Sequence, residues 1–426
     1  MIIVSNGHHK FITGMAAAEA YKNNVLAGFI TAGYPTPKLR RLIIRLKLDR
    51  YAPIKRLLQR QENLPDVFVH SLWLSELIYG ITRIIARQVP HFEADYGFQF
   101  YAWQAESIVR NLPGRIYHYR SGYGRDSVQI AKQKSMVALC DHSIAHPAAL
   151  EYLILNGGKL PPLGQDGPIN SLWRNILKDT DQADYLLVNS DFVKETFIHF
   201  GYDASRILVL YTGIDDRFLS LIPPRSYPSF TGRPIRLLFA GDMGARKGGR
   251  ILLEALMRIR DLSWQFEAIG SIDPSLRNDF PDFFTDERVA VTGHLPWDEL
   301  AEHMNMADIF VFPSLAEGSA RIVFMAMACG CYVITTPNSG SVVQDEIHGK
   351  IVAPGDVDAL EAALRESFLN QDRVPAVGRR NANLIKSRYT QSHYGNGLMT
   401  IYKMLMEHPA YLASVEKEAH SKKIEL

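Results

Sequence analysis

The stretch FVFPSLAEGSARIVFMAMACGCYVITT, residues 310–336, decides the fold of this chain of 426 residues. It begins with a bulky apolar run and ends with a β-branched run, and strands buried on both faces of a parallel sheet have such compositions. Between these runs lies a polar turn with one acid, Glu317, followed by the small residues Gly318, Ser319 and Ala320. The pattern predicts a strand, a turn, a helix that begins just after Glu317, and a second strand.

The beginning of this predicted helix is a candidate binding place. Free backbone amides and the positive end of the helix dipole meet there, and both favour a phosphate group or the polar rim of a sugar. The alternative is an ordinary strand–turn–helix crossover in which Glu317 is solvated. This segment alone does not decide between the two.

A second segment of the same kind, IRLLFAGDMGARKGGRILLEALM, covers residues 235–257. Its turn contains the cations Arg246 and Lys247 among the glycines Gly241, Gly244, Gly248 and Gly249. Glycines let the backbone approach a ligand closely, and paired cations attract a diphosphate. Ligands of open α/β sheets gather at the carboxyl ends of the strands, so the two turns together predict one anion site.

Length and composition are typical of a globular protein with two domains of roughly 200 residues each. Hydrophobic residues make up 47% of the chain and charged residues 22%, and the net charge of +2 gives no reason to expect a nucleic-acid partner. The three cysteines, Cys140, Cys329 and Cys331, lie on or beside apolar segments. They predict buried thiols in a reducing compartment.

The beginning of the chain and its apolar runs bear on location. Residues 1–10, MIIVSNGHHK, lack the basic leader and the long apolar core of a signal peptide. No apolar run reaches the roughly 20 residues that cross a bilayer. We therefore expect a cytoplasmic protein.

Apolar runs alternate with helical patterns along both halves of the chain, which predicts parallel α/β sheets. The strands expected in the first half are residues 1–5, 25–31, 115–119, 136–140, 185–188 and 207–210. A proline-rich run at residues 221–234, LIPPRSYPSFTGRP, marks a linker. The predicted division is a first domain of residues 1–220, a second domain of residues 221–390, and a C-terminal helix and tail of residues 391–426.

The C-terminal half resembles the retaining glycosyltransferases of family 4. In that family a turn with a basic residue and Lys-Gly holds the diphosphate of a nucleotide-sugar donor, and Pro-Ser, Glu-Gly and Ala-Met-Ala-x-Gly motifs follow. The residues that match these motifs are Arg246, Lys247, Gly248, Pro313, Ser314, Glu317, Gly318 and 326–330. The segment between them, VTGHLPWDELAEHMNMADIFVFPS, carries the family's spacing at Gly293, Glu299, Leu300, Ala307 and Asp308.

The first half is similar, more loosely, to a bacterial exopolysaccharide branch of the family. The matching residues are Ser5, Gly7, His9 and Phe11 in the opening turn and Gly213, Ile214 and Asp215 after the last strand. This branch implies a growing surface polysaccharide or a lipid-linked saccharide as the acceptor.

The resemblance implies the GT-B fold, in which two Rossmann-like α/β domains face each other across a cleft and a C-terminal helix crosses back to the first domain. It also implies a nucleotide-diphosphate sugar as the donor substrate, without a cofactor or a metal. The catalytic residues that it implies are His146, Lys247 and Glu317. The donor-binding residues that it implies are Gly7, Gly241, Arg246, Lys247, His294, Leu295, Glu317, Gly318, Ser319, Ala320 and Met325.

Two positions depart from the family's pattern. Members usually carry a second glutamate that binds the donor ribose, where this chain has Met325. Many also carry an arginine directly after the glycine of the phosphate turn, where this chain has Asp242. These departures motivate an alternative, a catalytically degenerate GT-B protein that acts as a binding or regulatory partner.

The histidines of the first half are further candidates. The family places a histidine that faces the donor sugar at the exit of the strand in VALCDHSIAHP, residues 137–147, and His146 is the match. His142 and His146 also have the spacing of metal ligands on a helix, but the proline that follows argues against a helix and no third ligand is evident. A structural histidine is the remaining alternative. Of the adjacent His8 and His9, we expect His9 to reach the cleft.

Residues 38–60, KLRRLIIRLKLDRYAPIKRLLQR, combine many cations with leucine and isoleucine at partly helical spacing. Such a segment can lie on an anionic membrane surface, where each cation adds about 1 kcal/mol. A solvated basic helix face over a buried apolar stripe is the alternative. Peripheral contact with the inner face of the cytoplasmic membrane is therefore one expectation for this segment.

Together these features predict transfer of a sugar with retention of its anomeric configuration. As the glycosidic bond breaks, negative charge grows on the diphosphate, and Arg246, Lys247 and the amides after Glu317 would stabilise it. Another GT-B chemistry, such as epimerisation of a nucleotide sugar, would consume the donor without an acceptor. A dinucleotide-dependent oxidoreductase is disfavoured, because its glycine fingerprint is absent from residues 1–31.

Overall fold

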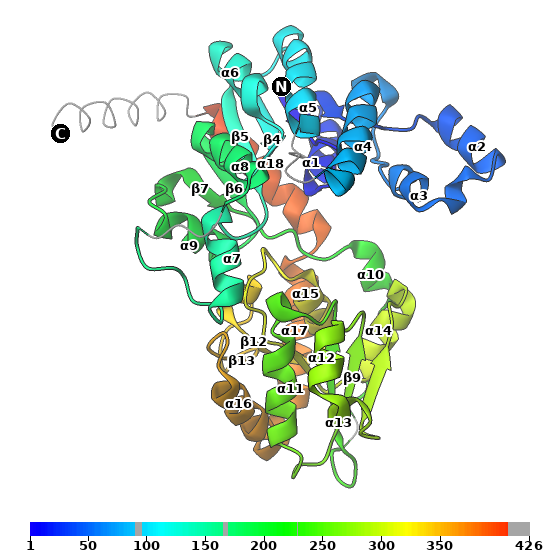
Figure 1. Ribbon diagram of the computed structural model, residues 1–426, viewed down its shortest axis with the longest axis vertical. Helices are drawn as coiled ribbons and strands as arrows, with labels where there is room; N and C mark the ends of the chain where they lie inside the picture. The colour runs from blue at the N-terminus through cyan, green and yellow to red at the C-terminus, as the bar shows by residue number, and fades with distance from the viewer. Residues whose placement is uncertain (90–95, 165–168, 228, 408–426) are drawn as a thin grey trace, which may run out of the picture.

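The structure of the protein is a computed structural model that describes residues 1–89, 96–164, 169–227 and 229–407. Two α/β domains lie one above the other in Figure 1, and each is built on a parallel sheet. No helix of the described residues has the length and hydropathy needed to cross a bilayer.

The first domain contains a seven-stranded sheet with the order β3-β2-β1-β4-β5-β6-β7. Its strands are β1 (Ile2–Ser5), β2 (Leu26–Thr31), β3 (Val69–Ser71), β4 (Ile116–Arg120), β5 (Val137–His142), β6 (Tyr185–Val188) and β7 (Ile207–Val209). Its helices are α1 (Ile12–Lys22), α2 (Pro37–Arg45), α3 (Ala52–Leu58), α4 (Trp73–Gln88), α5 (Tyr96–Asn111), α6 (Arg125–Gln133), α7 (Pro147–Leu155), α8 (Ser171–Gln182) and α9 (Asp191–His199).

Helices cover both faces of this sheet, which explains why its strands read as continuous apolar runs. Ile3 of β1 packs on one face in a cluster with Tyr101 of α5. Its neighbours Ile2 and Val4 pack on the other face with residues of α1. The six strands expected in the first half are present as β1, β2, β4, β5, β6 and β7, whereas the short edge strand β3 was not predicted.

The second domain contains a six-stranded sheet with the order β10-β9-β8-β11-β12-β13. Its strands are β8 (Ile235–Ala240), β9 (Trp264–Ile269), β10 (Val289–Thr292), β11 (Ile309–Phe312), β12 (Tyr332–Thr335) and β13 (Gly349–Ile351). Its helices are α11 (Gly249–Arg258), α12 (Pro274–Asp279), α13 (Pro281–Phe284), α14 (Trp297–Met306), α15 (Arg321–Ala328), α16 (Val357–Leu369) and α17 (Val374–Arg388). The three cysteines of the chain are buried and unpaired, as expected from the sequence.

The chain passes between the domains twice, and the two crossings lie side by side. The Ile214 amide donates to the carbonyl of Tyr389 (2.9 Å), and the Gln391 amide donates to the carbonyl of Ile214 (3.0 Å). Ile214 and Phe218, the latter in α10 (Asp216–Leu221), already pack in the core of the second domain. The first crossing therefore comes earlier than the boundary predicted at residue 220.

After the second crossing, α18 (Gln391–Glu407) returns to the first domain. Tyr394, Leu398 and Tyr402 of this helix pack in the same cluster as β1 and α1. The Tyr402 hydroxyl also shares a hydrogen bond of 2.6 Å with the buried His118 of β4. The predicted tail beyond residue 407 lies outside the described residues.

Candidate functional site

Two loops meet at the carboxyl ends of the neighbouring strands β8 and β11. The 3-10 turn of residues 245–247 follows β8, and the loop of residues 313–320 follows β11. The backbone carbonyl of Arg246 accepts hydrogen bonds from the Leu315 amide (2.9 Å) and the Ser314 hydroxyl (3.1 Å). Because of these bonds, each loop fixes the position of the other.

Gly248 makes this close approach possible. Its φ of +70° lies in the left-handed region, and a methyl group added to it would lie 2.0 Å from the carbonyl oxygen of Pro313. Any other residue would push the two loops apart, so the contact between the loops requires glycine at position 248.

The charged side chains of the two loops converge. One guanidinium nitrogen of Arg246 lies 2.7 Å from Glu317 Oε1, and Lys247 Nζ lies 3.8 Å from the same oxygen. Lys247 Nζ is also 5.2 Å from the centre of the Phe312 ring and lies against Gly241. The Glu317 and Lys247 side chains are only 14% and 18% exposed, so their charges are poorly screened by water. The structure thus brings Gly241, Arg246, Lys247 and Glu317 together.

The backbone between Glu317 and α15 offers unused hydrogen-bonding groups. The Glu317 and Ala320 amides donate to the carbonyls of residues 338 and 339, each at 2.9 Å. Within the part of the chain that the structure describes, no acceptor is recorded for the amides of Gly318 and Ser319. The Ser319 hydroxyl is buried and likewise has no recorded partner there. A ligand with acceptor oxygens would satisfy these donors.

Asp242 and His294 lie at the edge of this site, on the loops after β8 and β10. His294 Nε2 is 3.4 Å from Asp242 Oδ1, and the Ser271 hydroxyl donates to the same carboxylate (2.6 Å). The hydrogen bond from Ser271 and the nearby His294 lower the pKa of Asp242. The carboxylate is therefore ionised at neutral pH and is already bonded within the chain.

Leu295 and Met325 are apolar members of the predicted donor site. Leu295 is partly buried against the core of the second domain. Met325 is 8% exposed and packs in that core from α15. A thioether sulfur is only a weak acceptor, so Met325 cannot replace a carboxylate that accepts a hydrogen bond from a ribose hydroxyl.

The two domains touch at the loop that contains Gly318. The Ser190 hydroxyl of the first domain donates to the Gly318 carbonyl, and Asn338 Nδ2 donates to the Gly158 carbonyl at 2.7 Å. A methyl group on Gly318 would lie 1.9 Å from the carbonyl oxygen of Ser143. The Glu317–Gly318 turn therefore faces the first domain across a contact that only glycine permits.

The structure does not bring His146 into this cluster. The residue is 4% exposed, and its ring stacks on Phe200 with 4.2 Å between centroids and packs edge-on against Phe197. Its Nδ1 accepts from the Ala148 amide (3.2 Å) at the beginning of α7. Burial lowers the pKa of His146 to about 3, so the ring is neutral. Packing within the first domain accounts for this side chain, and its contact with a donor sugar stays a prediction.

Gly7 and the adjacent histidines surround an aromatic cluster at the end of β1. A methyl group added to Gly7 would lie 2.5 Å from the ring of Tyr123. The space next to the α-carbon of Gly7 is therefore filled by this ring and not by a ligand. His8 is fully buried and stacks on Tyr79 at 4.2 Å. His9 is partly exposed and lines a cavity, so of the two it is the accessible one.

The buried Asp179 of the first domain has a structural role. Asp179 is buried and accepts from the amides of Gly124 (2.7 Å) and Arg125 (2.6 Å), which anchors the beginning of α6. Its pKa is raised to about 6 by burial. In the part of the chain that is described, no group of three or more His, Cys, Asp or Glu residues could hold a metal ion.

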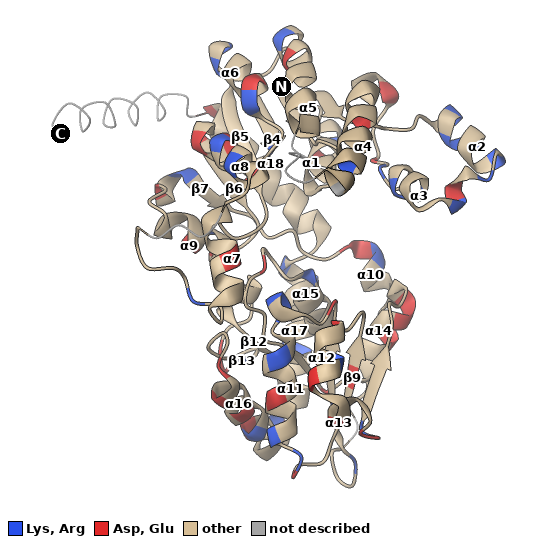
Figure 2. Cartoon of the chain, viewed as in Figure 1, with Lys and Arg blue, Asp and Glu red and all other residues tan. Residues whose placement is uncertain are grey.

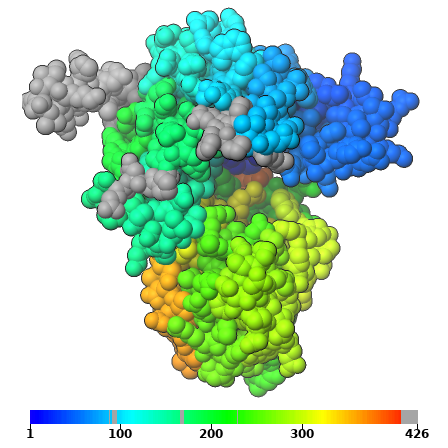
Figure 3. All heavy atoms as spheres, in the orientation of Figure 1, coloured from blue at the N-terminus to red at the C-terminus, as the bar shows by residue number. Residues whose placement is uncertain are grey.

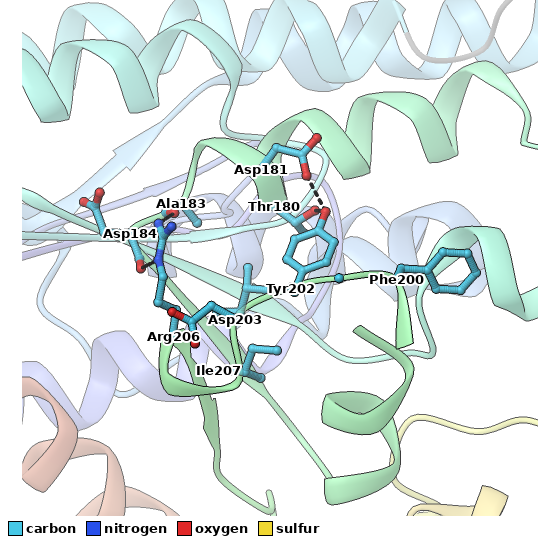
Figure 4. A pocket seen from close by; sticks show the side chains of 11 residues that line it. Thr180, Asp181, Ala183, Asp184, Phe200, Tyr202, Asp203, Arg206 and Ile207 are labelled. Carbon is cyan, nitrogen blue, oxygen red and sulfur yellow. Dashed lines mark hydrogen bonds between the residues drawn. The ribbon is translucent and has the colours of Figure 1, made fainter. Parts of the chain in front are cut away.

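A cavity of about 360 Å³ lies beside α8 and α9 (Figure 4). Asp184 and Arg206, which line it, come just before β6 and β7, so the cavity is at the amino ends of these strands and not at the carboxyl edge. Arg206 donates to the carbonyls of Asp184 (2.8 Å) and Ala183 (2.6 Å). The guanidinium group of Arg206 is thus already hydrogen-bonded within the chain.

Two parallel-sheet domains with a returning C-terminal helix define a GT-B protein, and comparison with solved structures agrees. Sucrose-phosphate synthase from Thermosynechococcus elongatus superposes with a TM-score of 0.63 at 15% identity, covering 96% of this chain and 99% of that one. HepE of Anabaena in complex with UDP superposes with a TM-score of 0.59 at 12% identity, covering 95% and 100%. At these identities the likeness concerns the fold alone.

Residues 234–370 match the family model of glycosyl transferases group 1, so the chain carries a domain of this family. The amylovoran biosynthesis glycosyltransferase AmsK of Erwinia amylovora is 27% identical over 209 residues, 46% of this chain and 50% of AmsK. The O-antigen chain mannosyltransferase B of Escherichia coli is 26% identical over 221 residues, 46% of this chain and 54% of that protein. The chain thus spans about half the length of these curated relatives, and the family resemblance seen in the sequence is confirmed.

Proposed function

We propose that the protein is a retaining glycosyltransferase that moves a sugar from a nucleotide-diphosphate sugar to an acceptor hydroxyl. The observation that carries this proposal is the cluster of Arg246, Lys247 and Glu317 beside the unused amides of Gly318 and Ser319. Similarity to AmsK and to the O-antigen mannosyltransferase supports a role in surface polysaccharide or glycolipid synthesis. HepE, which shares the fold, was solved in complex with UDP, so a nucleotide is compatible with this fold.

In the proposed reaction, the bond between the anomeric carbon and the diphosphate oxygen breaks, and the acceptor oxygen bonds to the same face of that carbon. The acceptor's proton passes to the leaving phosphate oxygen, so no protein base is required. Arg246, Lys247 and the two free amides stabilise the charge that develops on the diphosphate. Glu317 accepts hydrogen bonds from the donor sugar, while closure of the domains excludes water. The cations supply the positive charge, and the proposal needs no metal ion.

A second candidate is a degenerate GT-B protein that binds a partner and does not catalyse transfer. The observation in its favour is the buried thioether of Met325 where the family's ribose-binding glutamate is expected. Asp242, which is ionised near the proposed diphosphate position, adds to it. However, its carboxylate is held by Ser271 and lies beside His294, which offsets part of the repulsion.

We also propose that the reaction takes place in the cytoplasm, at the inner face of the cytoplasmic membrane. Residues 38–60 form α2 and α3, two short helices that project from the first domain at the right of Figure 1. Leu42, Ile44 and Leu46 are 52–57% exposed among exposed cations, which Figure 2 shows in blue on this projection. Exposed apolar side chains between cations are typical of a membrane-surface segment, and of the apolar residues of α2 only Ile43 is buried.

Ligand binding separates the two candidates. We expect UDP or GDP to raise the melting temperature of the full chain, because a ligand that binds only the folded state stabilises it. With the matching nucleotide sugar and a saccharide acceptor, a glycosylated product with retained anomeric configuration should appear by NMR. A folded protein whose melting temperature responds to no nucleoside diphosphate or nucleotide sugar would favour the degenerate candidate.

The packing of His146 leads to a prediction of its own. We expect His146→Phe to keep sugar transfer within a few-fold of wild type, because a phenyl ring fits among Phe197 and Phe200. The loss of its hydrogen bond at the beginning of α7 should lower the free energy of unfolding by about 1 kcal/mol. Turnover and chemical denaturation measure the two effects. A folded variant with turnover reduced by two orders of magnitude would instead establish the sugar contact predicted from the sequence.

A further inference from the structure

A second cavity, of about 480 Å³, lies in the first domain between α3, α4 and the turn after β1. His9 and Lys10, which line it, follow the carboxyl end of β1. Ligands of parallel sheets gather at this edge, and the donor cluster occupies the corresponding edge of the other sheet. The cavity is therefore on the side where an acceptor would meet the donor. The space-filling view in Figure 3 shows a recess between this part of the first domain and the second domain.

The charges around this cavity are unbalanced. Its charged lining residues are Lys10, Arg56, Arg60, Arg83 and Glu76. Glu76 is engaged by Arg60 in a forked pair with distances of 2.5 and 3.0 Å. In the described part of the chain, Lys10, Arg56 and Arg83 have no carboxylate within 4.0 Å. Arg83 lies over the ring of Tyr79, 5.6 Å from its centre, so its contact is aromatic and its charge, like those of Lys10 and Arg56, is not neutralised by a carboxylate.

The positive charges around the cavity act on its histidine, His9. His9 Nε2 shares a hydrogen bond of 2.8 Å with the hydroxyl of Tyr79. Burial lowers the pKa of His9 most and Arg60 lowers it next, Glu76 acts in the opposite direction, and Arg83 and Arg56 lower it further. Arg56 of α3, Arg60 in the loop after α3 and Arg83 of α4 thus act on one point from different segments, an arrangement that suits a multiply charged group.

An exposed apolar stripe borders the same cavity. Leu77, Ile81 and Ile84 of α4 are 60%, 46% and 58% exposed, and their spacing places them on one face of the helix. Ile84 also lines the cavity, together with Gly80. Contiguous exposed apolar side chains of this kind mark a contact with a partner or a lipid.

We propose that this cavity binds the diphosphate of a lipid-linked saccharide, whose hydrocarbon chain lies along the exposed face of α4. The proposal rests on the proposed function and names the class of its acceptor. A ligand with an anionic group next to a hydrocarbon chain satisfies both the apolar stripe and the cations that have no carboxylate partner among the described residues. A free anion satisfies only the cations, and a neutral lipid satisfies only the stripe. The exposed Leu42 and Ile44 of α2 are a second apolar surface of the first domain.

Vesicle co-sedimentation of the full chain tests this proposal without nucleotide or sugar. The vesicles contain phosphatidylcholine with either undecaprenyl diphosphate or phosphatidylglycerol at equal total charge. We expect the diphosphate vesicles to bind the wild type more tightly. The double variant Arg56→Ala/Arg83→Ala should weaken this binding by about tenfold or more, because each cation near a membrane contributes measurably. The matched control is Arg41→Ala/Arg45→Ala on α2, which removes the same charge outside the cavity and should retain the preference for diphosphate.

Two outcomes would overturn the proposal. In one, the wild type binds both kinds of vesicle equally and the two double variants lose binding to the same extent, which means general attraction to an anionic surface. In the other, inorganic diphosphate raises the melting temperature while the vesicles show no preference, which means a site for a free anion. Circular dichroism of each variant confirms folding. Because no donor is present, this test can fail while nucleotide binding succeeds, and the reverse also holds.

Discussion

Lys247→Ala is expected to reduce sugar transfer by on the order of a hundredfold or more, the scale for loss of a group that stabilises transition-state charge. The ammonium group is poorly exposed and lies 3.8 Å from Glu317 Oε1, in a place where water cannot replace it well. Glu317→Gln should have a comparable effect for a different reason. It removes the charge that holds both Arg246 and Lys247 in place, and it replaces one of the two carboxylate oxygens that would orient the donor sugar with an NH2 donor.

Steady-state kinetics distinguish these roles. For Lys247→Ala, kcat and kcat/KM should fall together if the cation acts chiefly on the leaving diphosphate. Lys403→Ala is a suitable control, because this lysine is 74% exposed on α18 and remote in sequence from both loops. Near-normal transfer by both site variants would contradict the assignment of the cluster as the donor site. Folding is checked by the melting temperature without ligand.

Gly318→Ala is expected to reduce sugar transfer about as strongly as Lys247→Ala, because it disturbs the contact between the domains. Its methyl group would lie 1.9 Å from the carbonyl oxygen of Ser143, which is backbone and cannot rotate away. The two domains must then separate locally, which also strains the bond from Ser190 to the Gly318 carbonyl. Since the Gly318 amide is one of the proposed diphosphate donors, a small displacement misplaces it.

Small-angle X-ray scattering together with turnover checks this expectation. The variant should show a larger radius of gyration than wild type and a lower kcat/KM. Gly397→Ala is the matched control, because its methyl group would meet only the flexible end of Leu210 within the first domain. An unchanged radius of gyration with unchanged turnover would show that the Ser143 contact is not required in the active arrangement.

The architecture could be predicted from sequence to a large extent because its signals are local. Buried parallel strands such as β11 and β12 are continuous apolar runs, and the turns that follow carry glycines. The edge strand β3 lacks this signal, since Val69–Ser71 is short and only partly buried. The position of the first crossing was also beyond local patterns, because it depends on the packing of Ile214 and Phe218 against a distant core.

That Gly241, Arg246, Lys247 and Glu317 come together was predictable, because they lie in two short motifs with a characteristic spacing. The position of His146 was not, since its stacking on Phe200 depends on where α9 packs against α7. The cavity of the first domain could not be predicted from the sequence for a similar reason. Lys10, Arg56 and Arg83 come from three separate segments and meet only in the folded chain. The basic segment of residues 38–60 and the helical spacing of Leu77, Ile81 and Ile84 were local signals that pointed to two of its sides.

The hydrogen bonds that join Ile214 to Tyr389 and Gln391 have a mechanical consequence. A sliding movement of one domain past the other would break both bonds, whereas a rotation about an axis through residues 214 and 390 would preserve them. Opening and closing should therefore be a hinged swing of two rigid bodies. In such a swing, the separation of the domains grows with distance from the axis, so the widest opening lies at the rim farthest from these paired backbone segments.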